Sequence, residues 1–108
     1  MANVFTSYVA KDVGTSASTL VTVAASTQTT LIGLTVANTS ASSITCDVYF
    51  TRSAVDYYIV KGAIVANGRT FVAVGGDQKT VLITSDALKV VTSAATSADV
   101  IASVLNIT

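Results

Sequence analysis

The sequence predicts an all-β protein, an antiparallel β-sandwich of jelly-roll or immunoglobulin-like type with about eight strands and an extended N-terminal arm. Three observations predict this class: many residues branched at Cβ, one clear apolar–polar alternation, and regularly spaced loop segments. Val, Ile and Thr number 17, 7 and 17 of the 108 residues. These types fit a pleated, half-buried surface and lose rotamer freedom in helices. A chain of this length forms one hydrophobic core.

The clearest strand is residues 44–52, in which Ile44, Cys46, Val48 and Phe50 alternate with polar residues. Such a period of two indicates a strand with one buried and one wet face, so Cys46 is expected to be buried and unreactive. Further strands are expected at residues 20–23, 31–37, 57–61, 70–74, 80–84, 88–92 and 100–107. This many short strands in one domain indicates a sandwich or jelly roll.

Turn residues separate these strands. Asn67-Gly68 predicts a tight hairpin between the apolar residues 63–65 and 70–72, because both turn positions tolerate positive φ. Gly75-Gly76-Asp77 predicts another reversal, and residues 38–43 and 93–98 are rich in small polar residues typical of loops.

Residues 1–19 differ from the sandwich expected over residues 20–108. They carry Phe5, Tyr8 and Val9 and then a flexible Gly-Thr-Ser-Ala-Ser segment, so they are interpreted as an arm that reaches a neighbouring subunit. The alternative is a first edge strand folded onto its own sheet.

Charge limits the partners. Six Lys and Arg balance six Asp, the mean hydropathy is +0.66, and only 11% of residues are charged. Without a basic surface, nucleic-acid binding is not expected. The long uncharged stretch between Asp12 and Asp47 is interrupted by Ser and Thr, and no apolar run within it reaches the roughly 18 residues of a membrane span. No membrane partner is therefore expected either.

The residues needed for catalysis are scarce. The chain has no His and no Glu, a single Cys, and six Asp that are isolated in sequence. General acid–base catalysis, a serine triad and a zinc or calcium site all need residues that are missing or not clustered. We therefore expect no enzyme activity, no metal and no cofactor, and each Asp is interpreted as a turn or strand-end residue.

Exposed aromatic residues are the remaining functional feature. Tyr57 and Tyr58 are adjacent in an expected strand, so they point to opposite faces. An exposed Tyr58 offers a flat apolar ring with a polar tip, which suits a protein or a sugar partner. The alternative is that the tyrosines shield the sheet against a neighbouring subunit or a loop.

Several segments resemble small virion structural proteins of tailed bacteriophages. They are Met-Ala-Asn-Val-Phe at residues 1–5 and the segments at residues 13–16, 32–40, 47–49, 58–63, 76–82 and 99–105. Such proteins commonly carry Leu-x-x-Gly-Asp-x-Leu-x-Val, which residues 82–90 match except that Ser85 replaces the glycine. This replacement argues against a left-handed turn at Ser85.

The resemblance implies an oligomeric β-sandwich subunit of a capsid, neck or tail, with no catalytic residue. The expected role is a capsid decoration subunit in the virion, made in the host cytoplasm. The alternatives are a neck, collar or tail-fibre adaptor, or a glycan-binding module of a tail fibre. The expected partners are further copies of the chain, with a trimer favoured, and other virion proteins such as the major capsid protein. The expected interface residues are Phe5, Tyr8, Val9 and Tyr58.

Overall fold

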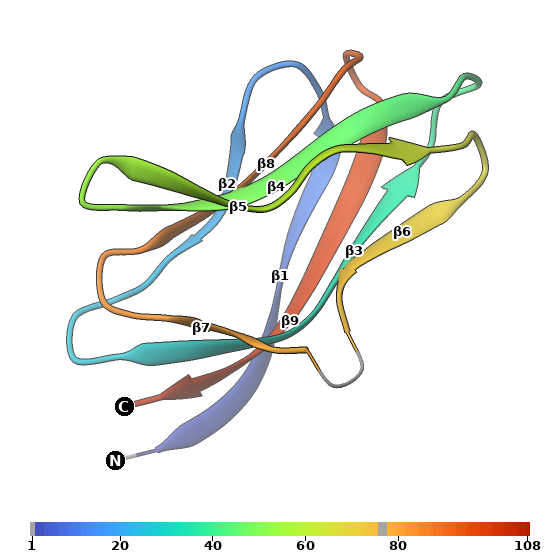
Figure 1. Cartoon of the computed structure of the whole chain (residues 1–108). Coiled ribbons are helices and arrows are strands. Elements are labelled where there is room, and N and C mark those ends of the chain that lie inside the picture. Colours follow the sequence, from blue (N-terminus) through green and yellow to red (C-terminus); the bar gives the residue numbers. More distant parts are fainter. Residues whose placement is uncertain (1, 76–77) are drawn as a thin grey trace.

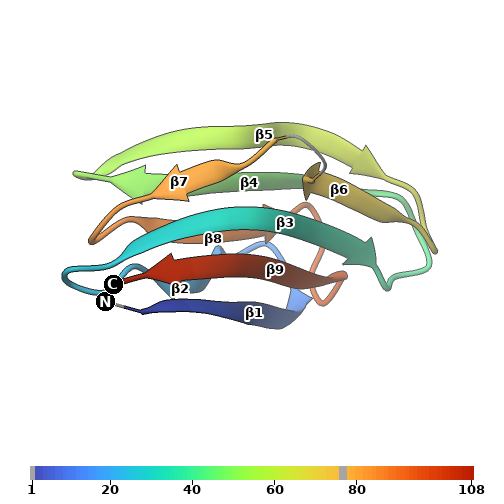
Figure 2. The same cartoon turned by 90° about the horizontal axis from the view of Figure 1, so that it is seen from below.

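The computed structural model describes residues 2–75 and 78–108, which form nine strands in two antiparallel sheets (Figure 1). Sheet A has the order β1-β9-β3-β6, with the short β7 also paired to β3, and sheet B has the order β2-β8-β4-β5. Seen from below, the sheets form two layers (Figure 2). The strands are β1 (Asn3–Val13), β2 (Ser18–Thr22), β3 (Gln28–Asn38), β4 (Ile44–Arg52), β5 (Val55–Val65), β6 (Thr70–Val74), β7 (Thr80–Leu82), β8 (Ala87–Thr92) and β9 (Ala98–Ile107).

The connectivity is that of a jelly roll, in which the chain forms one long antiparallel ribbon that is rolled into a sandwich. β1 pairs with β9, β2 with β8, β3 with β6 and β7, and β4 with β5. The tip of this ribbon is the turn between β4 and β5, where Ser53 and Ala54 have φ values of 53° and 63°. Positive φ at both central residues is the geometry of a tight type I′ hairpin. The structure therefore confirms the sandwich and specifies its jelly-roll form.

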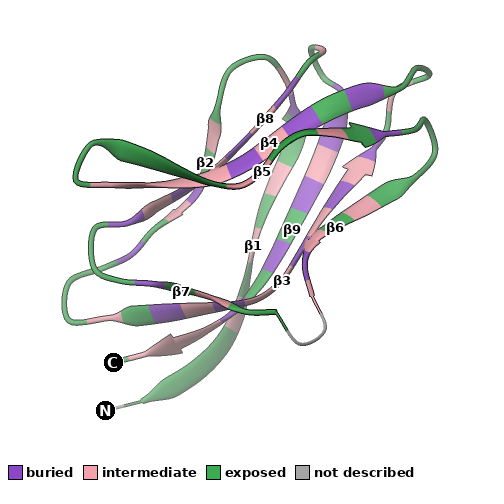
Figure 3. Cartoon of the chain, in the orientation of Figure 1, coloured by how far each residue is buried: buried purple, intermediate pink, exposed green. Residues whose placement is uncertain are grey.

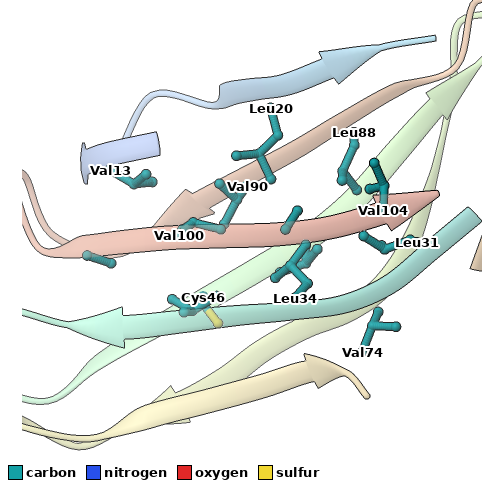
Figure 4. Packing of buried hydrophobic residues seen from close by; sticks show 14 of the residues in the cluster. Val13, Leu20, Leu31, Leu34, Cys46, Val74, Leu88, Val90, Val100 and Val104 are labelled. Carbon is teal, nitrogen blue, oxygen red and sulfur yellow. The ribbon is translucent and has the colours of Figure 1, made fainter. Parts of the chain in front are cut away.

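The core lies between the two inner sheet faces and consists mainly of Val, Leu and Ala. Inward positions alternate with exposed ones along the central strands (Figure 3), most regularly in β9, where Ala98, Val100, Ala102 and Val104 are fully buried. Figure 4 shows the side chains of both sheets meeting in this layer, with Cys46 among them. The expected burial of Cys46 is confirmed, because only 1% of the residue is exposed.

The structure does not confirm the extended N-terminal arm expected for residues 1–19. Asn3–Val13 forms the edge strand β1 and pairs with β9 from Asn3↔Ile107 to Val13↔Ala98. The amide of Ala2 also donates to Thr108 Oγ1 at 3.2 Å, so the two ends of the chain lie side by side. The alternative of an edge strand is therefore correct, because β9 offers β1 a partner of nearly its full length. Deleting the first twelve residues would remove a strand rather than a flexible arm.

The hairpin predicted at Asn67-Gly68 is also wrong, although a turn is present. The amide of Arg69 donates to the carbonyl of Ala66 at 3.1 Å, and Gly68 has a φ of 73° while Asn67 is not left-handed. One positive φ at the third position is typical of a type II turn, which does not match the twist of a hairpin. The turn instead carries the chain from β5 in sheet B to β6 in sheet A.

The turn between β7 and β8 does contain a left-handed residue, contrary to the expectation for Ser85. Ser85 has a φ of 76°, and the amide of Asp86 donates to the carbonyl of Ile83 at 3.0 Å. The amide of Ser85 donates to the carbonyl of Val23 at 2.9 Å, which holds this conformation against the segment after β2. The reversal expected at Gly75-Gly76-Asp77 includes residues 76 and 77, which lie outside the described residues.

We predict that Ser85→Gly raises the free energy of unfolding by about 0.5–1 kcal/mol, because glycine adopts positive φ without the steric cost that a Cβ imposes. Denaturant titration followed by circular dichroism measures the change. Ser43→Gly, at an exposed position without positive φ, is the matched control and should be neutral or lower the stability. A Ser85→Gly variant less stable than the parent would contradict the strain.

Candidate functional site

The outer face of sheet A carries apolar side chains where a sheet facing water would carry polar ones. Two rows cross the strands. The first joins Phe5, Leu105, Thr30 and Val81, and the second joins Val9, Ile101, Thr35 and Val72. We call the apolar members of these two rows the apolar face: Phe5, Leu105, Val81, Val9, Ile101 and Val72.

Five of these six side chains are exposed, and Leu105 is half-buried. Phe5 and Val9 are 75% and 70% exposed, and Val72, Ile101 and Val81 lie between 46% and 58%. Single exposed apolar residues are ordinary, but a group of them on one face of a sheet, here with only small Ser and Thr side chains between them, favours an interaction site. Ser7 and Ser103 pair with each other between the two rows. The side chains in the middle of the face are therefore small and project less than those of the two rows.

The apolar face is almost uncharged. The strands of sheet A contain only three charged residues, Lys11, Asp12 and Asp99, all at one end of the face. Lys11 Nζ lies 3.3 Å from Asp99 Oδ2 and 4.0 Å from Asp12 Oδ1, so the single cation offsets one of the two negative charges. The amide of Asp12 donates to Asp99 Oδ1 at 3.1 Å, and this bond and Lys11 lower the pKa of Asp99.

A hollow of about 230 Å³ opens on the same face beside this ion pair. It is lined by Val9, Ala10, Lys11, Asp99, Val100 and Ile101. β1 and β9 lose their regular register between Ala10 and Val13, which is the position of the hollow. The face thus combines a protruding ring, Phe5, with a recess roughly five residues further along the same strand.

Only two of the four expected interface residues lie on this face. Phe5 and Val9 point outward, but Tyr8 points to the inner side of β1, is half-buried and packs against the core. Its hydroxyl oxygen accepts a hydrogen bond from Asn106 Nδ2 at 3.0 Å, and Asn106 Oδ1 accepts one from the buried Thr29 at 2.6 Å. Tyr8 therefore closes one end of the sandwich, between β1, β9 and β3.

Tyr58 lies on the outer face of sheet B, on the other side of the molecule. Its ring is 44% exposed, lies 4.9 Å from the ring of Tyr49 and has Lys61 Nζ 4.3 Å from its centroid. Burial and the nearby Asp56 raise the pKa of Tyr49. Tyr57 points the other way and stacks on Phe50 at 5.5 Å, so the two tyrosines do face opposite sides.

Charged residues surround this tyrosine pair. Lys89 is opposite Tyr49 on β8, and Asp47 and Asp56 lie on the neighbouring positions of β4 and β5. Asp56 Oδ1 accepts from Thr51 at 2.7 Å, and Asp47 Oδ1 accepts from the amide of Gly62 at 2.7 Å. The outer face of sheet B is therefore mixed in charge and clearly different from the apolar face.

Asp86 has a role that the sequence did not reveal, since it is more than a turn residue. It is 1% exposed and forms a bidentate ion pair with Arg52, whose Nη2 and Nε donate at 2.6 Å and 2.9 Å. Its Oδ2 also accepts from the amide of Ile83 at 2.9 Å. The Arg52 hydrogen bond is the main reason why the pKa of Asp86 is lowered. The pair fastens the end of β4 to the turn before β8.

The described residues contain no cluster of three or more Cys, Asp, Glu or His side chains that could hold a metal ion. Cys46 stands alone, and burial raises the pKa of its thiol to about 11, with Asp47 adding to the effect. A thiol with such a pKa is protonated at neutral pH and is a poor nucleophile. The absence of enzyme activity stays a prediction.

In comparisons with known proteins, no family model matches the chain, and no curated protein is significantly similar to it. A helix long and apolar enough to cross a membrane is not found in the described residues.

We predict that Arg52→Met lowers the free energy of unfolding by about 2–4 kcal/mol at neutral pH, because it leaves the buried Asp86 carboxylate without its cation. The pH dependence changes as well. In the parent protein the pKa of Asp86 is lower in the folded state, so its stabilisation is complete above the unfolded pKa of about 4 and is lost as the pH falls through the folded value. In the variant this acid loss is absent.

Urea titrations of both proteins between pH 7 and pH 3 measure the effect. Lys89→Met removes a cation from the same end of sheet B and serves as the control, with a change of about 0.5 kcal/mol or less expected. Equal acid sensitivity in the parent and in Arg52→Met would show that the ion pair is not the cause.

Proposed function

We propose that the chain is a structural subunit of a tailed bacteriophage virion, a capsid decoration protein that assembles with further copies of itself on the major capsid protein. The observation that carries the proposal is the apolar face. A face with Phe5 and Val9 at 75% and 70% exposure, and with its three charged residues confined to one end, is poorly suited to water and well suited to a permanent protein neighbour.

The fold supports the same class of function. Jelly rolls are used in viral capsid and lectin domains, although a fold alone does not determine a function. The resemblance of residues 82–90 to the Leu-x-x-Gly-Asp-x-Leu-x-Val pattern also gains a structural basis. Ser85 has the left-handed φ of 76° for which a glycine is suited, and Asp86 binds Arg52. The pattern thus corresponds to a turn whose aspartate is anchored inside the protein.

A second candidate rests on the tyrosine pair. Tyr49 and Tyr58 form an exposed aromatic surface next to Asp47, Asp56 and Lys61. Stacking of a sugar ring with hydrogen bonds from flanking polar groups is a common way to bind carbohydrates, so a glycan-binding role in a tail fibre would use this face. We rank it below the structural role, because the pair is small and lies on a sheet rather than in a recess.

The experiment is a count of copies in purified particles of the phage that encodes the chain, by quantitative mass spectrometry against the major capsid protein. The proposal expects on the order of hundreds of copies per particle, as symmetric capsid decoration requires. Roughly a dozen to a few dozen copies would replace decoration by a neck or tail role. Absence from the particles would overturn the virion assignment.

A further inference from the structure

We infer that the apolar face is covered by a second copy of this chain, packed sheet A against sheet A about a twofold axis near Ser7 and Ser103. This inference rests on the proposed structural role and names the partner of that same face. Four features of the face support it: its area, its charge, its single-sidedness and the match between Phe5 and the hollow.

The area of the face matches what a stable dimer needs. Three strands of ten or eleven residues and the short β6 and β7 beside β3, at a spacing of about 4.8 Å and a rise of about 3.3 Å per residue, cover roughly 600 Å². A typical stable interface buries about 800 Å² on each partner. One copy placed squarely on the face therefore covers the exposed apolar side chains without any contribution from elsewhere.

The face carries both a protruding side chain, Phe5, and a hollow into which the same side chain of a second copy could fit. Phe5 protrudes at one end of β1, and the hollow of about 230 Å³ between Val9, Lys11, Asp99 and Ile101 lies at the other end. Ser7, with its partner Ser103, stands midway between them. A twofold axis through this midpoint, crossing the strands, would bring Phe5 of each copy over the hollow of the other.

Charge agrees with this arrangement. Lys11 lies 3.3 Å from Asp99 and 4.0 Å from Asp12 within each copy, so one negative charge per copy remains, at the end of the face where the Asp12 side chain is half exposed to water. An aromatic ring placed beside the Lys11 ammonium group would also gain a cation–π contact. The small Ser7 and Ser103 side chains leave the two backbones free to approach at the centre of the interface.

A twofold arrangement is favoured because only one of the two outer sheet faces, that of sheet A, is apolar. A threefold ring uses two different patches that fit each other, whereas a twofold dimer uses one patch twice. The outer face of sheet B carries Asp47, Asp56, Lys61 and Lys89, and it would bury these charges against apolar side chains. The apolar face is complementary to itself and not to the other side of the molecule.

The experiment measures the mass of the full chain at micromolar concentrations by analytical ultracentrifugation. The parent protein is expected to be a dimer. Phe5→Asp is expected to raise the dimer dissociation constant by about 30-fold or more, because buried aromatic residues dominate interface energies and this one occurs twice. Ile64→Asp is the matched control, since Ile64 is also 75% exposed on an edge strand but on the outer face of sheet B. It should leave the dimer intact.

A second measurement locates the axis. In Ser103→Cys the new thiol is accessible in the monomer that exchanges with the dimer, whereas Cys46 is 1% exposed. A short bis-maleimide should then link two chains through residue 103, and should not link Ile64→Cys. If Phe5→Asp fails to fold, as judged by circular dichroism, Val9→Asp replaces it.

The inference would be overturned if the parent protein were a monomer or a trimer. It would also be overturned by a dimer that is lost in Ile64→Asp but kept in Phe5→Asp, or by the absence of cross-linking at residue 103. These results are distinguishable from failure of the proposed function. A dimer in solution with no copies in the virion removes the virion role alone, whereas a monomer in solution with hundreds of copies in the virion removes the twofold partner alone.

Discussion

The whole structure depends on the antiparallel pairing of the first half of the chain with the second half. Strand partners lie at nearly equal distances from the tip at Ser53 and Ala54, from Ile44↔Val65 near the tip to Asn3↔Ile107 at the ends. Rolling this ribbon places its successive strand pairs alternately in the two sheets: β1–β9 and β3–β6/β7 lie in sheet A, and β2–β8 and β4–β5 lie in sheet B. The two layers enclose the core. Most contacts are therefore between residues far apart in the sequence, and β9 has a central role because it pairs with both β1 and β3.

The same pairing assembles the apolar face. Phe5 and Leu105 are at opposite ends of the chain, and Val72 and Val81 come from its middle, yet all four are outward neighbours in sheet A. Side chains of Val, Leu and Ala fill most of the space between the two inner faces, so the outward apolar residues do not contribute to the core. The ion pair of Arg52 with the buried Asp86, and the Tyr8–Asn106–Thr29 hydrogen bonds within sheet A, stabilise the fold at other places. The proposed contact with a partner would thus use residues other than those that stabilise the fold.

Local periodicity was sufficient to predict the strands but not their partners. The eight expected strands correspond to β2–β9, and the alternation of Ile44 to Arg52 correctly placed Cys46 inside. Residues 1–19 were interpreted as an arm because a flexible Gly-Thr-Ser-Ala-Ser segment follows Phe5, Tyr8 and Val9. In the structure Phe5 and Val9 face outward, and an apolar outer face hides the usual alternation of a strand. Asn67-Gly68, the strongest hairpin signal, marks a crossover between sheets, while the actual hairpin at Ser53-Ala54 has ordinary residues. The sequence did not predict four members of the apolar face, Ile101, Leu105, Val72 and Val81, because residues of different strands can be assigned to one face only when the strand register is known. The available signal was Val or Ile at strand positions that point outward.

The central claim is that the outer face of sheet A is covered by protein in the assembled state. Hydroxyl-radical footprinting read by mass spectrometry tests this directly, with each residue compared between dilute and concentrated protein. Oxidation of Phe5 and Ile101 should fall several-fold as the protein associates, while that of Ile64, on the outer face of sheet B, should stay constant. Equal oxidation of Phe5 and Ile101 at both concentrations, or protection of Ile64 in their place, would contradict the account.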